Sequence, residues 1–124
     1  MEKAIAMTAC GGLLVHDLGP LPPAGEGCVL ELSLTLERVR PEARTAVALT
    51  LTELDEEDRE YPRGMRTLLV PAHHDENPRD VTVQNIRFLL PCELSVGGPE
   101  GRRFRVRYDR QCIDCPAVCE LTQA

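Results

Sequence analysis

The sequence has 124 residues, of which 43% are hydrophobic, so it has the length and composition of one folded domain and not of a disordered chain. Its net charge is −6, which argues against general binding to nucleic acid or to anionic membranes, because both favour a basic surface. Only 3% of the residues are aromatic, too few to build a platform that stacks single-stranded bases. No stretch reaches the length of a membrane-spanning helix.

The first 27 residues combine an apolar arm with a spacer. Residues 4–18 have the composition of two short extended pieces, separated by Gly11 and Gly12. Residues 19–27 are rich in proline and glycine, which excludes a regular helix and predicts a semi-rigid spacer. The apolar run before Cys10 spans about six residues, fewer than the roughly seven to fifteen of a signal peptide. No classical signal peptide is therefore visible.

The clearest strand pattern lies at residues 30–37, where leucine fills every second position and polar residues fill the others. A period of two places the four leucines on one face of a strand. Residues 47–52 repeat the alternation after a turn at Arg40-Pro41-Glu42. We predict that these two strands form an antiparallel hairpin with one face in water.

Further strands and polar turns follow along the chain. The acidic residues 53–60 are expected to form a solvated turn, and strands are expected at 65–70, 81–90 and 103–108. Within 81–90 the apolar face moves from Val81 and Val83 to Ile86 and Phe88. This shift of one position predicts a β-bulge near Gln84-Asn85.

These elements predict an all-β fold, a single-domain antiparallel β-sandwich of about seven strands with a jelly-roll or immunoglobulin-like arrangement. We divide the chain into an N-terminal arm and spacer at 1–27, the sandwich at 28–111 and a cysteine-rich tail at 112–124.

Cysteines are the most distinctive residues. The six are Cys10, Cys28, Cys92, Cys112, Cys115 and Cys119. In an oxidising compartment they would form disulfides, and in the cytosol they would bind metal or stay as free thiols. We predict a disulfide or assembly role for all six, within one chain or between chains. As an alternative, Cys112, Cys115 and Cys119 would bind Zn²⁺ with one further ligand, such as Cys92, Cys10 or a histidine.

Other polar clusters are weaker candidates. His73-His74-Asp75 could coordinate a metal, and the acidic residues at 55–58 could bind Ca²⁺ weakly, although solvated loops explain both. Arg103, Arg105 and Arg107 share one strand face, and we expect them to pair with acids between sheets or subunits or to protect an edge. No Gly-x-Ser-x-Gly or phosphate-binding loop occurs, so we predict no catalytic residues, no cofactor and no enzyme activity.

Residues 39–91 resemble a family of uncharacterised cysteine-bearing β-sandwich proteins from anaerobic spore-forming bacteria. The segments that carry the resemblance are 47–49, 51–55, 60–67, 70–74, 80–81 and 86–91. The resemblance covers about half of the chain. It implies a bacterial source and a surface, spore or structural context.

We therefore expect a structural protein that self-assembles at a bacterial cell surface or spore surface or in an extracellular fibre. The arm would complete a neighbour's sheet by strand addition, disulfides would lock the polymer, and the partners would be copies of the chain. One alternative is a small zinc-binding module, which would place the protein in the cytoplasm. A second alternative is a β-sandwich that binds a ligand.

Overall fold

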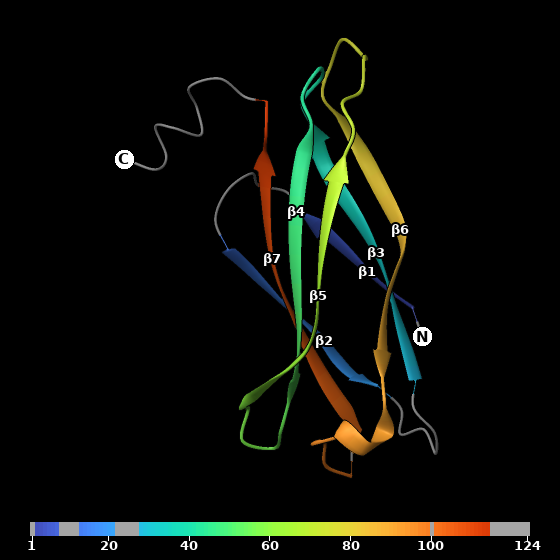
Figure 1. Ribbon diagram of the computed structural model, residues 1–124, viewed down its shortest axis with the longest axis vertical. Coiled ribbons are helices and arrows are strands. Elements are labelled where there is room, and N and C mark those ends of the chain that lie inside the picture. The colour runs from blue at the N-terminus through green and yellow to red at the C-terminus, as the bar shows by residue number, and fades with distance from the viewer. Residues whose placement is uncertain (1, 8–12, 22–27, 100, 115–124) are drawn as a thin grey trace.

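The structure is a computed structural model that describes the backbone of residues 2–7, 13–21, 28–99 and 101–114. Side chains are described for residues 15–18, 29–99 and 101–114. It confirms an all-β sandwich of seven strands (Figure 1). The elements are β1 (Glu2–Met7), β2 (Leu13–Leu21), β3 (Cys28–Val39), β4 (Thr45–Leu54), β5 (Glu60–Val70), β6 (Arg79–Leu90), the short 3₁₀ helix η1 (Cys92–Leu94) and β7 (Arg102–Cys112).

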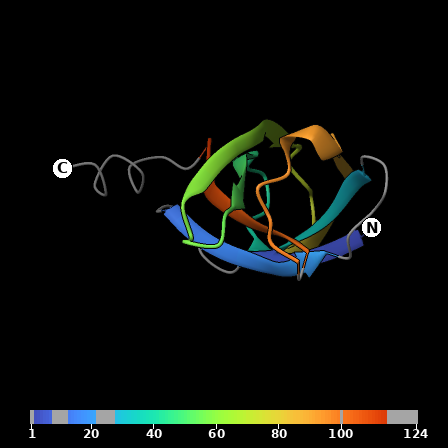
Figure 2. The same ribbon diagram turned by 90° about the horizontal axis from the view of Figure 1, so that it is seen from below.

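The strands form two sheets that face each other (Figure 2). One sheet has the order β1-β3-β6, and the other has the order β2-β7-β4-β5. All pairs are antiparallel except β1 and β3, which run parallel. The arm thus lies against its own chain in this structure: β1 forms an edge of the first sheet and β2 an edge of the second.

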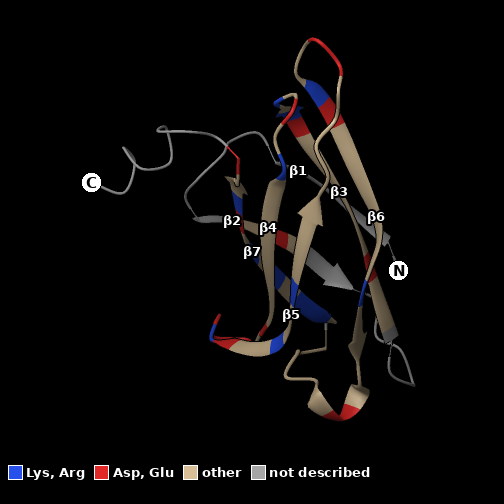
Figure 3. Ribbon diagram, turned by 45° about the horizontal axis from the view of Figure 1, so that its top comes forward, with Lys and Arg blue, Asp and Glu red and all other residues tan. Residues whose placement is uncertain are grey.

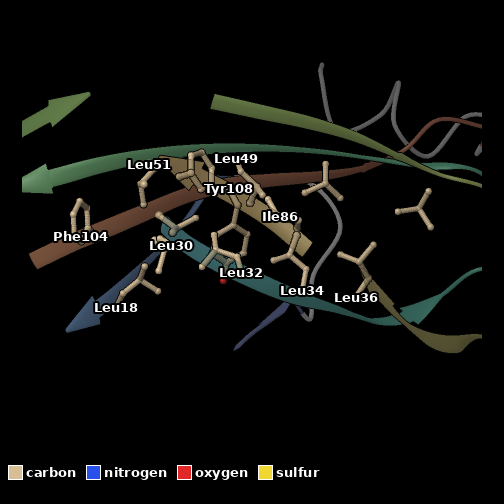
Figure 4. Packing of buried hydrophobic residues seen from close by; sticks show 14 of the residues in the cluster. Leu18, Leu30, Leu32, Leu34, Leu36, Leu49, Leu51, Ile86, Phe104 and Tyr108 are labelled. Carbon is tan, nitrogen blue, oxygen red and sulfur yellow. The ribbon is translucent and has the colours of Figure 1, made fainter. Parts of the chain in front are cut away.

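The core fills the space between the sheets with side chains that alternate along each strand (Figure 4). The four alternating leucines of β3, from Leu30 to Leu36, are at most 1% exposed. Leu49 and Leu51 of β4, with Phe104 and Val106 of β7, meet them from the other sheet, and all four are fully buried. Burial of this apolar surface supplies the main stabilisation of the fold.

The predicted hairpin of residues 30–37 and 47–52 is wrong. β3 pairs with β1 and β6, whereas β4 pairs with β5 and β7, so the two strands belong to opposite sheets. Alternation specifies which face of a strand is buried but not its neighbour. The turn at Pro41 and Glu42 therefore carries the chain from one sheet to the other, and both leucine faces still reach the same core.

The predicted bulge is confirmed. Leu32 pairs with Ile86 and Leu34 with Val83, so two residues of β6 lie opposite one of β3, and Asn85 has a φ of 64°. The spacer prediction needs correction at its start, because residues 19–21 belong to β2 and pair with β7. Proline is tolerated there because β2 is an edge strand, where a missing N–H need not break a ladder.

Candidate functional site

A buried charge cluster lies where β4 ends. Glu53 is 0% exposed. Its Oε1 accepts hydrogen bonds from Arg63 Nε at 2.9 Å and Arg102 Nη2 at 2.7 Å. Its Oε2 accepts from Arg102 Nε at 3.0 Å and from the Val96 N–H at 3.1 Å. One carboxylate thus satisfies four donors from three parts of the chain.

The two arginines extend this cluster to the loop after β6. Arg102 Nη1 donates to the Leu90 carbonyl at 3.0 Å, and Arg63 Nη2 donates to the Leu94 carbonyl at 2.6 Å. The Arg102 guanidinium also lies 5.3 Å from the centre of the Phe104 ring, within the range of a cation–π contact. Because the cluster joins β4, β5 and β7 to η1, it fixes the loop across the end of the sandwich.

Burial by itself raises the pKa of Glu53, but the hydrogen bonds from Arg102, Arg63 and the Val96 N–H outweigh it and hold the pKa below its usual value. Glu53 is therefore ionised inside the protein. This corrects the prediction that residues 53–60 form a solvated turn, because β4 continues to Leu54 and carries Glu53 into the interior. The signal was available in the sequence, since Glu53 is in phase with Leu49 and Leu51.

Arg105 and Arg107 of β7 form a second charge network with acids of β2 and β5 in the same four-stranded sheet. Figure 3 marks the basic and acidic residues of the described strands. Arg105 pairs with Asp17 of β2, with Nε 2.6 Å from Oδ1, and with Glu60 of β5 at 3.3 Å. Arg107 also pairs with Glu60, whose pKa these hydrogen bonds lower to about 2. Because β7 lies between β2 and β4, these pairs run within one sheet, and the prediction of a charged edge or of inter-sheet pairing is wrong for them.

The weaker metal candidates have local partners. Asp55 accepts hydrogen bonds from the backbone of Glu57 and Arg59 and from the Tyr61 hydroxyl. Burial would raise the pKa of Asp55, but these bonds lower it to about 2. Such an Asx-type arrangement stabilises the turn itself.

His73 and His74 also have hydrogen-bond partners within the chain. His73 Nε2 lies 2.7 Å from the Val39 carbonyl, and His74 Nδ1 lies 2.9 Å from Glu42 Oε1. Among the described residues, no group of three or more His, Cys, Asp or Glu side chains is placed to hold a metal ion. Through these hydrogen bonds, His73 and His74 stabilise the turn that connects β3 to β4.

The end of β7 is tied to the turn before β4. Asp114 accepts hydrogen bonds from the Arg44 N–H at 3.0 Å, from Arg44 Nε at 2.9 Å and from Arg44 Nη2 at 3.0 Å. These bonds lower the pKa of Asp114 to about 2. The Ile113 N–H donates to the Arg44 carbonyl at 2.8 Å. The start of the cysteine-rich tail is therefore held against the body.

The cysteines occupy several environments. Cys92 has a free thiol and is exposed on η1, whereas Cys112 at the end of β7 is disulfide-bonded. Cys28 begins β3, but its side chain is not described, and Cys10, Cys115 and Cys119 lie outside the described residues. The disulfide or assembly role of the six cysteines and the zinc alternative at Cys112, Cys115 and Cys119 both stay predictions. Metal analysis of protein purified without a chelator would test the second.

The last candidate is the seam between β5 and β6, which are edge strands of different sheets. One half of the seam is closed. Arg66 of β5 lies 4.8 Å from the centre of the Phe88 ring and donates to the Arg87 carbonyl of β6 at 2.9 Å. Gly64 permits the Phe88 ring to lie close to the backbone of β5, since a Cβ at position 64 would lie 2.7 Å from Phe88 Cδ1.

The other half of the seam is open. It forms a groove of about 530 Å³ lined by residues 67–71 of β5 and the loop after it and by residues 81–84 of β6. Leu68, Val81 and Val83 line it and pack against the core beneath. Leu69 is 56% exposed at its rim. The groove therefore brings apolar side chains and two strand edges to the surface.

The fold and these sites define a β-sandwich domain whose charge clusters stabilise it from within and whose Cys92 presents an exposed thiol. The chain belongs to the family of exosporium protein B (CsxB), which it matches over residues 23–119. No curated protein and no solved structure matches the chain. The exosporium is the outer layer of a bacterial spore, so membership supports the expected spore-surface context. It suggests a structural rather than an enzymatic role. Within the described residues, no helix is long and apolar enough to cross a membrane.

Proposed function

We propose that this protein is a structural subunit of the spore's outer layer that assembles with copies of itself through strand pairing and disulfide bonds. Membership of the exosporium protein B family carries this proposal. A surface layer needs a repeating contact between subunits, and a sandwich with unpaired edges offers one. Among the described strands, β1, β6, β2 and β5 lie at the sheet edges.

The positions of Cys92 and Cys112 support a head-to-tail arrangement. Cys92 precedes β7 and Cys112 ends it, and the 11 residues of β7 run along the long axis of the molecule (Figure 1). An extended strand of that length spans about 33 Å. The exposed Cys92 and the disulfide-bonded Cys112 therefore lie at opposite ends of the body. A contact between unlike ends repeats from copy to copy and yields a ring or an open polymer.

The test uses the full-length chain, purified with its thiols alkylated at lysis or left to oxidise in air. Sedimentation velocity and electron microscopy report assembly, and non-reducing gels against reducing gels report disulfide bonds. We expect particles larger than a monomer, and a ladder of bands that reduction collapses to one. A variant with all six cysteines changed to serine should still associate but should dissociate more readily on dilution. A full-length protein that stays monomeric under every condition would refute self-assembly.

A further inference from the structure

We propose that the open half of the β5/β6 seam is the acceptor groove for the N-terminal strand of a second copy of this chain. This inference rests on the proposed self-assembly and names the surface that would carry it. The groove has two walls. One consists of residues 67–70 of β5 and the following residue 71, and the other consists of residues 81–84 of β6. Each wall belongs to the edge of a different sheet.

The shape of the groove selects an extended segment. β5 pairs only with β4, and β6 pairs only with β3, among the described strands. The free side of each strand therefore presents backbone N–H and C=O groups that a further strand can pair with. A helix has satisfied its own backbone groups and cannot supply these bonds. A strand in the groove would extend one sheet and cover the apolar side chains between both.

The chemistry of the walls selects an uncharged segment. None of the residues that line the groove is acidic or basic, although 27% of the whole sequence is charged. The closed half of the seam differs, because Arg66 and Arg87 lie there. Charged side chains are a usual protection of strand edges against pairing. The protein therefore protects half of this seam and leaves the other half suited to an apolar strand.

The N-terminal arm of the chain has the matching composition. Residues 4–15 contain no Asp, Glu, Lys, Arg or His, and no other uncharged run in the sequence is as long. Within this run, residues 4–7 belong to β1 and equal in number the four residues that β6 contributes to the groove. The occupant that fits by length, charge and extended conformation is thus the arm of another copy.

The arm is also the segment whose exchange disturbs the body least. β1 lies at a sheet edge and, among the described strands, pairs only with β3, in a parallel pair of six residues. Parallel pairs are slightly less stable per residue than antiparallel ones. Because β1 pairs with no described strand other than β3, it can leave β3 without opening a second strand pair. Donation of such an edge strand to the groove of a neighbouring copy therefore costs the donor this one strand pair.

The experiment places the photo-crosslinking residue benzoylphenylalanine at position 5 of the full-length chain. This chain is mixed with an equal amount of ¹⁵N-labelled chain, so that mass spectrometry separates links between copies from links within one copy. We expect inter-chain links from position 5 to residues 67–71 or 81–84. Leu69→Lys, at the rim of the groove, should reduce these links about tenfold or more, because it places a charge in an apolar contact.

Leu89→Lys is the matched control, because Leu89 is 68% exposed on β6 but does not line the groove. It should leave the links unchanged. Two results would overturn the groove assignment while self-assembly stands. One is inter-chain links that run from position 5 only to β3, and the other is links whose yield Leu69→Lys does not change. A wild-type chain that gives no inter-chain links and sediments as a monomer would overturn the proposed function itself.

Discussion

Replacement of the buried Glu53 by glutamine should destabilise the protein strongly. Each carboxylate oxygen accepts two hydrogen bonds, so the amide nitrogen that replaces either oxygen leaves two donors without an acceptor. The two arginines of the cluster also lose the charge that compensates them. Breaking a buried ion pair in this way costs about 3–5 kcal/mol. Domains of this size have a free energy of unfolding of only about 5–15 kcal/mol.

Urea unfolding followed by far-ultraviolet circular dichroism measures this loss, and thermal unfolding should show a midpoint lowered by about 10–20 °C. Asp75→Asn is the control. It breaks the exposed pair of Asp75 with Arg79, whose side chains are 55% and 54% exposed, and should leave the urea midpoint close to that of wild type. A Glu53→Gln protein no less stable than Asp75→Asn would refute the reasoning that the cluster fixes the end of the sandwich.

Three further predictions concern the seam, the acid sensitivity and the tail. Gly64→Ala should lower the free energy of unfolding by about 1–3 kcal/mol in urea, because its Cβ would overlap the buried Phe88 ring; a change below about 0.5 kcal/mol would contradict this contact. The lowered pKa of Glu60, about 2 against 4.5, means that the unfolded chain binds more protons between these values, so stability should fall as the pH drops from about 5 towards 2. Urea titrations across this range should show the difference between wild type and Glu60→Gln shrinking as the pH falls, and a constant difference would argue against the pairing. Asp114→Asn should weaken the contact with Arg44 and speed amide hydrogen exchange at residue 113, while the exchange of the core strands stays as in wild type.

Much of the fold could be predicted from the sequence because the relevant signals are local. The leucines of β3 alternate without interruption, and they line the core as expected. The change of phase between Val83 and Ile86 marked the bulge, which Asn85 accommodates with its positive φ. Both signals lie within a few residues of the feature that they predict.

Strand pairing could not be predicted in the same way. A short connection between two alternating strands usually indicates a hairpin, yet residues 40–44 link strands of opposite sheets. The amphipathic faces of β3 and β4 are equally well buried in either arrangement. The choice depends on β5, β6 and β7, which follow later in the chain and compete as partners for the same edges.

The buried charge cluster was not predicted, because the acidic character of residues 53–60 was given more weight than the two-residue period that Glu53 shares with the strand before it. Glu53 follows Leu49 and Leu51 at intervals of two, and Arg102 precedes Phe104 and Val106 at the same interval, so period alone directs both side chains inward. A buried acid requires a buried base as partner, and two inward positions of opposite charge at strand ends satisfy that requirement together. Phase therefore predicts a Glu53–Arg102 pair, whereas the contribution of Arg63 depends on the shift in register between β4 and β5 at Leu51 and Thr52, which only the folded structure reveals.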